Sequence, residues 1–188
     1  ATLIVKGSSA FLQTHIRLEI EYSADILAPN GTLDTAYADF DAIIRNALAE
    51  QFPQANDRNS RRELQRMVSI GAGYQLRAAI EAHPDLLGKR QSIFLPAAAN
   101  VDMVVKGNID RQLPETQRQI SDSQLAWIDQ LESDDRLVRK FNTALFTNGD
   151  SREPELAGIR GALMGSIYML VVTIVLSFPI GAAAAVYL

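Results

Sequence analysis

Two histidines, His15 and His83, are the only imidazole side chains in the sequence that could bind a metal or transfer a proton near neutral pH. They lie far apart along the chain, so the sequence offers no local two-histidine metal spacing. It also contains no cysteine, which excludes disulfides and a thiolate metal site. We therefore expect both histidines to be structural.

Neighbouring carboxylates are the next candidates, because general acid–base catalysis often uses two such groups. The sequence has Asp39 close to Asp41, and Asp134 beside Asp135. Side chains this close in sequence point apart, and acidic surfaces are common, so we expect neither pair to be catalytic. No serine stands in a GxSxG elbow, since Ser166 lies inside an apolar tail.

Two glycine-containing segments match nucleotide-binding loops only in part. Residues 71–73 read GAG, but a dinucleotide fingerprint would need glycine where the chain has Leu76. Residues 88–90 read GKR, but a phosphate loop would also need glycine in place of His83 and Ser or Thr in place of Arg90. We expect no catalytic residue, no cofactor-binding residue, no cofactor and no metal ligand, and no enzymatic activity.

Arginines form the one dense basic cluster, at Arg58, Arg61, Arg62 and Arg66. Such a cluster could meet an anion or an acidic partner surface, but a solvated helix face is the simpler interpretation. Arg160 stands directly before the apolar tail, where a cation could snorkel to lipid phosphates or face a translocation path. Snorkelling is the default expectation.

Charge divides the 188 residues into two unlike parts. Residues 1–157 hold 17 basic residues (18 less Arg160) against 22 acidic ones, a net charge of −5, which argues against nucleic acid as a partner. No charged residue or histidine follows Arg160. We therefore expect a soluble domain over residues 1–157 and a membrane segment over residues 158–188.

The tail, residues 161–188, reads GALMGSIYMLVVTIVLSFPIGAAAAVYL. As a helix it would extend about 42 Å at 1.5 Å per residue, enough to cross a hydrocarbon core of about 30 Å. A buried core helix is the alternative, but such helices rarely contain so many uncharged residues. The composition predicts a membrane span.

Small residues and a proline in this tail favour a bundle of several helices over a lone anchor. Gly161 and Gly165 have GxxxG spacing, which lets another helix approach closely, and the pair Gly181 and Ala185 repeats it. Pro179 is expected to kink the helix, which is tolerated when neighbouring helices and hydroxyl groups satisfy the freed carbonyl.

The soluble part predicts an α+β fold. Residues 14–23 alternate apolar and polar side chains, as in a half-buried strand, and a turn at residues 28–32 follows. Residues 34–52 then place apolar side chains at helical spacing, at Tyr37, Phe40, Ile44, Ala47 and Leu48. Ser60 and Glu63 form a capping box for a second helix that extends through Ile80, with an interruption at residues 71–73.

The second half of this domain predicts further strands and another helix. Residues 91–105 give two short β-prone stretches. Ser121 and Gln124 form a capping box for a helix through Leu131, and apolar spacing continues through Phe141 after an acidic break at residues 134–135. Residues 147–155 are a polar linker to the membrane segment.

At the linker and tail the sequence becomes specific. The string NGDSREPELAGIRGALMGSIYMLVVTIVLSFPIGAAAAVYL resembles the region that leads into the core membrane helices of phosphate ABC-transporter permeases of the PstA type. Upstream, SAFLQTHIRLEIEY, HPDLLGKR, VVKGNIDR, SDSQLAWIDQL and FNTALF resemble a large extracytoplasmic insertion in one branch of that family. The resemblance covers nearly the whole chain.

This resemblance implies a permease subunit of an ATP-driven inorganic phosphate importer in a bacterial inner membrane. Residues 1–157 would be periplasmic, and the tail would be the second span of a multi-pass protein. The implied partners are a second homologous permease subunit, two ATP-binding subunits, a periplasmic phosphate-binding protein and membrane lipid. No phosphate-contacting residue of the family maps onto this sequence. The family's coupling loop and other spans are absent, so we expect a piece of a longer protein.

A membrane-anchored extracytoplasmic sensor or interaction domain is the alternative. In that case ligand binding to the soluble part would be relayed through one span. Sequence beyond residue 188 would separate the two: further apolar segments indicate a permease, and a coiled coil or kinase-like region indicates a sensor.

Overall fold

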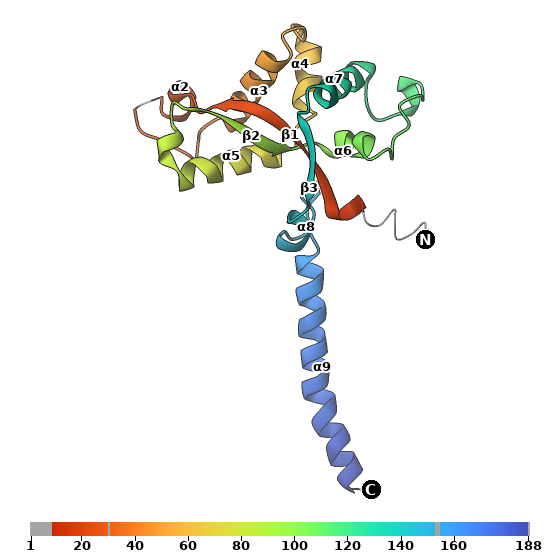
Figure 1. Ribbon diagram of the computed structural model, residues 1–188. Coiled ribbons are helices and arrows are strands. Elements are labelled where there is room, and N and C mark those ends of the chain that lie inside the picture. The colour runs from red at the N-terminus through yellow and green to blue at the C-terminus, as the bar shows by residue number, and fades with distance from the viewer. Residues whose placement is uncertain (1–8, 30, 153–154, 188) are drawn as a thin grey trace. The chain divides into compact units, whose positions relative to one another are not determined.

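A computed structural model describes residues 9–29, 31–152 and 155–187, so the parts of the predictions that fall on residues 1–8, 30, 153–154 and 188 lie outside it. The fold is α+β, as predicted, and ends in a long apolar helix (Figure 1). In chain order the elements are η1 (Ser9–Phe11), β1 (Leu12–Glu21), α2 (Ala24–Leu27), α3 (Phe40–Gln51), α4 (Arg58–Gln65), α5 (Gly71–Ala82), η2 (Pro84–Leu86), β2 (Arg90–Pro96), α6 (Ala99–Val105), η3 (Glu115–Gln117), α7 (Asp122–Ser133), β3 (Leu137–Phe141), α8 (Ala144–Thr147) and α9 (Arg160–Tyr187).

The chain divides into two compact units, Ala1–Phe141 (unit 1) and Asn142–Leu188 (unit 2). This division reflects which residues of the chain pack against one another. The predicted passage from water to membrane after residue 157 concerns the surroundings of the chain and stays a prediction.

A three-stranded antiparallel sheet in the order β2-β1-β3 forms the centre of unit 1. Ile16, Leu18 and Ile20 of β1 are completely buried, while the residues between them are only partly covered. The strand predicted over residues 14–23 is thereby confirmed, but it begins and ends two residues earlier than predicted. Its alternation gives the sheet one apolar face, against which helices can pack.

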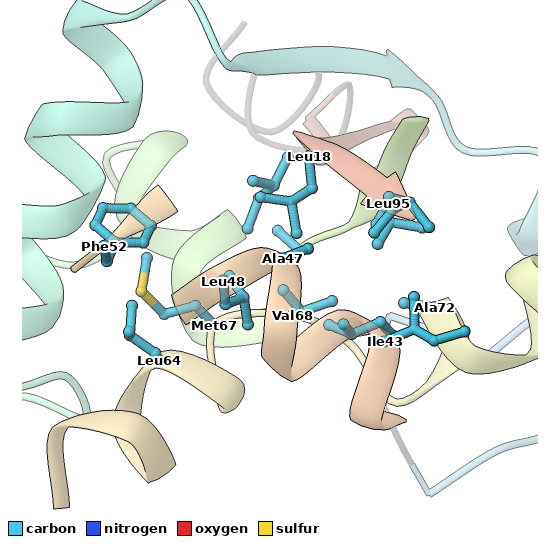
Figure 2. Packing of buried hydrophobic residues seen from close by; sticks show 14 of the residues in the cluster. Leu18, Ile43, Ala47, Leu48, Phe52, Leu64, Met67, Val68, Ala72 and Leu95 are labelled. Carbon is cyan, nitrogen blue, oxygen red and sulfur yellow. The ribbon is translucent and has the colours of Figure 1, made fainter. Parts of the chain in front are cut away.

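Helix α3 packs on that face against β1, while α5 packs against β2 (Figure 1). Ile43, Ala47 and Leu48 of α3 recur at helical spacing and are buried in the same cluster as Leu18 and Leu95 of the sheet (Figure 2). Each leucine or isoleucine of this set contributes about 2 kcal/mol when it leaves water, so the shared cluster is what holds the two layers together.

Helix α3 is shorter at its start than predicted. The carboxylate of Asp39 accepts the backbone N–H of Ala42 at 2.8 Å, which fixes the first turn at Phe40. Tyr37 precedes this cap and is 90% exposed, so its assignment to the apolar face of the helix is wrong. The cap side chain outweighed the apolar spacing.

The predicted second helix is two helices. Asp57 caps α4 by accepting the N–H groups of Asn59 and Ser60, so the predicted capping box of Ser60 and Glu63 is wrong. The chain then breaks at residues 66–70, where Val68 forms a β-bridge with Ala97. The predicted interruption at residues 71–73 is also wrong, because these residues open α5.

Residues 91–105 give one strand and one helix instead of two strands. The first stretch is β2, as predicted, but the second is α6. Asp102 of α6 accepts both the backbone N–H and the hydroxyl of Thr14 in β1, at 2.9 and 2.7 Å, and pairs with Lys106 at 2.5 Å. This link at the sheet outweighs the β propensity of the valines.

Helix α7 confirms the predicted capping box of Ser121 and Gln124. It does not continue to Phe141, however, because Asp135 adopts a left-handed conformation with φ 52° and ends the helical run. The following residues form β3, in which Leu137 pairs with Ile16 of β1. The prediction of continued helical spacing is wrong there.

Candidate functional site

Helix α9 is the one helix among the described residues that is long and apolar enough to cross a membrane. It has 28 residues, Arg160–Tyr187, and therefore extends about 42 Å. Its apolar side chains are exposed all round the helix. An apolar surface on every side suits a lipid environment and is consistent with membrane anchoring.

Two hydroxyl groups within α9 form hydrogen bonds with the backbone of the same helix. Ser166 donates its hydroxyl hydrogen to the carbonyl of Ala162 at 2.9 Å, and Thr173 donates to Met169 at 2.8 Å. Such bonds suit a medium without water. The helix also continues through Pro179, as tolerated in membrane helices.

The segment that leads into α9 is folded. Gly158 donates its N–H to the carbonyl of Gly149 at 2.8 Å, and Asn148 donates its side-chain amide to the carbonyl of Leu156 at 3.0 Å. A Cβ at Gly158 would collide with the carbonyl oxygens of Asn148 and Ala144. Only glycine fits, so the predicted linker contains a close backbone contact that composition alone did not indicate.

The two histidines occupy separate places in unit 1. His15 lies on β1, where its Nδ1 is 3.1 Å from the carbonyl oxygen of Gln13, and burial lowers its pKa. His83 is exposed and follows the last residue of α5. In the described parts of the chain no three His, Cys, Asp or Glu side chains gather as a metal site would require.

The paired carboxylates lie at helix ends. Burial of Asp39 disfavours its charge, but bonds from Ala42 and Arg45 outweigh this, so the pKa of Asp39 lies below its ordinary value. Asp134 follows the last residue of α7, and Asp135 makes the left-handed turn. Asp39 and Asp135 thereby have structural roles at these helix ends.

The glycine segments also have structural roles. At Gly73 an added Cβ would lie 3.4 Å from a carboxylate oxygen of Asp41, so glycine allows α5 to approach α3 closely. Gly88 has a φ of 75° and donates its N–H to the carbonyl of Tyr22 at 2.7 Å, which makes it a turn before β2.

The arginine cluster lines a concave surface between α3 and α4. Two cavities of about 180 and 340 Å³ adjoin there, because Arg45, Arg61 and Gln65 line both. Arg58 and Arg62 line the larger one. We call these two adjoining hollows the arginine cavity, and no acidic residue lines either of them.

The predicted cluster is regrouped by the fold. Arg66 faces a different cavity, of about 270 Å³, together with Arg118 and two glutamates. Arg45, which sequence reasoning missed, joins Arg61 because α3 packs beside α4. Residues 58, 61, 62 and 65 share one helix face by their spacing, so the α4 part of the cavity could have been found from sequence, but Arg45 could not.

Comparison with known families now adds to this geometry. Residues 1–115 match the family described as a domain of unknown function, DUF3333. The chain belongs to this family. No curated protein and no solved structure matches the chain.

The DUF3333 match contains β1, β2 and both helices that form the arginine cavity, but it ends before α7 and β3. Trp127, Ile128 and Leu131 of α7 are nevertheless buried in the same core, and β3 pairs with β1. Unit 1 therefore extends beyond the part of the chain that defines the family.

Proposed function

We propose that this chain belongs to the permease subunit of an ATP-driven inorganic phosphate importer. Unit 1 would face the periplasm of a bacterial cell, and α9 would be one of several spans in the inner membrane. The chain would not itself be an enzyme, because ATP hydrolysis would take place in partner subunits.

One observation supports this proposal most directly. The described part of the string that resembles the permease family contains a close-packed turn at Gly158 followed by the helix α9. The close backbone contact at Gly158 shows that this string has a defined fold in addition to its apolar composition. The exposed small residues Gly161, Gly165 and Gly181 leave room for neighbouring helices.

The proposed partners follow from the same resemblance. A second homologous permease subunit would pack against the spans, ATP-binding subunits would dock on the cytoplasmic side, and a periplasmic phosphate-binding protein would deliver the substrate. The net charge of −5 on residues 1–157 favours a salt-sensitive contact of this domain with the binding protein. Binding that is unchanged after deletion of the domain would rule that contact out.

Uptake of labelled phosphate at micromolar concentration tests the transport function. Cells that lack the full-length gene should lose high-affinity uptake, and restoring the gene should recover it, with competition by unlabelled phosphate but not by sulfate. Unchanged uptake in a strain with no second importer would contradict the proposal and favour the sensor alternative.

A glycine pair sharpens this test. Gly158→Val in the restored gene should reduce uptake towards the level of the deleted strain, because its side chain collides with two backbone carbonyls. Gly149→Val is the matched control, since an added Cβ there meets no atom within 4 Å. Immunoblots of membrane fractions would check that both variants are present in equal amount.

A further inference from the structure

We propose that the arginine cavity in unit 1 binds a phosphate group, supplied either by free inorganic phosphate or by the headgroup of a lipid. The site goes beyond the transport function proposed above and does not depend on it. It rests on the charges and positions of residues from α3 and α4.

Three of the four arginines that line the cavity have no carboxylate partner among the described residues. In the described ranges, Arg58, Arg61 and Arg62 form no ion pair with any carboxylate. Arg45 is paired with Asp39 at 2.9 Å, but Asp39 does not line the cavity. Three unpaired guanidinium groups thus gather in a chain whose net charge is −4.

Their spacing is unfavourable without an anion. Arg58 is three and four residues away from Arg61 and Arg62, so all three lie on the same face of α4, where like charges repel. Some surface arginines elsewhere in unit 1 do have a carboxylate beside them: Arg77 bonds to Glu81 at 2.8 Å, and Arg90 to Glu50 at 2.6 Å. The three arginines of the cavity have no such neighbour, so an external anion between them would relieve their mutual repulsion.

The shape of the cavity favours a small group over a flat protein surface. Arg45 lines the cavity from α3 and the other arginines line it from α4, so basic residues of two helices border the same hollow. Leu48, Ala49 and Leu64 provide apolar walls in the smaller hollow, which strengthens electrostatic attraction nearby. A planar guanidinium group can donate two parallel hydrogen bonds to two oxygens of one phosphate, so arginine suits a phosphate site.

Calorimetry on the full 188-residue chain tests this site. With the chain in nanodiscs of uncharged phosphatidylcholine, titration of inorganic phosphate should give saturable heat that weakens as salt is added. Arg61→Ala should weaken binding about tenfold or more, as expected for loss of one charged hydrogen bond. Arg61→Lys should also weaken it, because lysine keeps the charge but not the planar fork.

Arg77→Ala is the matched control. It removes the same charge from another exposed helix of unit 1, so phosphate affinity should stay within about twofold of the unaltered chain if the cavity is the site. Equal weakening by Arg77→Ala and Arg61→Ala would show a general charge effect and overturn the proposal. Circular dichroism would confirm that the variants are folded.

A second arm distinguishes the source of the phosphate group. In nanodiscs of anionic phosphatidylglycerol without free phosphate, headgroup binding should slow hydrogen exchange across residues 58–65, and Arg61→Ala should abolish this protection. Saturable heat in uncharged discs identifies free phosphate instead. If neither signal appears, the arginine cavity is not a phosphate site, whatever the outcome of the uptake experiment.

Discussion

The core of unit 1 and helix α9 contain the same kinds of apolar side chain in opposite surroundings. Leu76 in α5 is fully buried, whereas Leu176 in α9 is 61% exposed. Helices α3 and α5 have one apolar face each and meet the sheet with it, while α9 is apolar on every side. The first arrangement builds a protein core, and the second needs an apolar solvent.

The difference shows that hydrophobicity stabilises two separate equilibria in this chain. In unit 1 it drives folding, and the buried cluster extends from β1 to α7. In α9 it would drive transfer into a bilayer, where a leucine lowers the free energy of insertion by only a few tenths of a kcal/mol (about 0.5). Substitutions in the two regions should therefore change different measurements.

The largest expected effect compares one substitution in both regions. Leu76→Ala should lower the free energy of unfolding of unit 1 by about 2–5 kcal/mol, because it leaves a cavity in the core. Leu176→Ala should leave it unchanged. Urea unfolding of the full chain, followed by the fluorescence of Trp127, measures this, since Trp127 is the only tryptophan and its ring lies 6.1 Å from that of Phe52. Equal destabilisation by both variants would contradict the comparison.

The second prediction concerns a substitution that should change membrane insertion of α9 and leave the folding of unit 1 unchanged. Val172→Arg places a charge in the middle of α9 and should raise the free energy of membrane insertion by about 3 kcal/mol. The fraction of chain that alkaline carbonate extracts from vesicles should rise accordingly. Ile70→Arg, at a position of unit 1 that is 60% exposed, serves as the control and should extract like the unaltered chain.

A polar contact in unit 1 provides the third prediction. Asp102→Ala would leave the N–H and hydroxyl of Thr14 without their acceptor and Lys106 without its partner. We expect a loss of about 2–3 kcal/mol in unfolding free energy, read from Trp127 as above. Asp25→Ala, an exposed position in α2, should change it by less than about 0.5 kcal/mol. Similar stability of the two variants would mean that α6 does not depend on this link.

The smallest expected effect concerns pH. Burial holds the pKa of His15 below its ordinary value of about 6.5, so the unfolded chain binds a proton at a higher pH than the folded one. His15 therefore contributes a constant amount to the free energy of unfolding above about pH 6.5. As the pH falls from there to the lowered pKa, the histidine destabilises the folded state.

Urea titrations of the full chain at several pH values would measure this slope. His15→Gln should flatten it, whereas His83→Gln, at an exposed position, should not. The lowered pKa of Asp39 acts in a separate and more acidic range, where its stabilisation is lost as pH falls. A slope that survives His15→Gln would assign the pH dependence to other groups.

Strong local signals were read correctly from the sequence. The alternation in β1, the capping box of α7 and the uncharged run of α9 each use a period or motif that needs no distant residue. The errors in secondary structure lie mainly where a distant or competing contact decides. Residues 99–105 became helical with Asp102 bonded to Thr14, and residues 137–141 became a strand beside β1.

The candidate site shows the same division. The stripe of arginines on α4 follows from spacing alone, because residues three and four apart share a helix face. Arg45 joins it only through the packing of α3 beside α4, and Arg66 leaves it for the cavity near Arg118. No local pattern could have indicated either change.

The sequence by itself determined which stretches of this protein are apolar and with what period, and so its α+β class and its long helix α9. Only the tertiary structure decided that the valines of α6 lie on a helix and which arginines share a cavity. The physical reason is range: periodicity and caps act within a few residues, whereas the bond from Thr14 to Asp102 joins residues 88 apart in the chain.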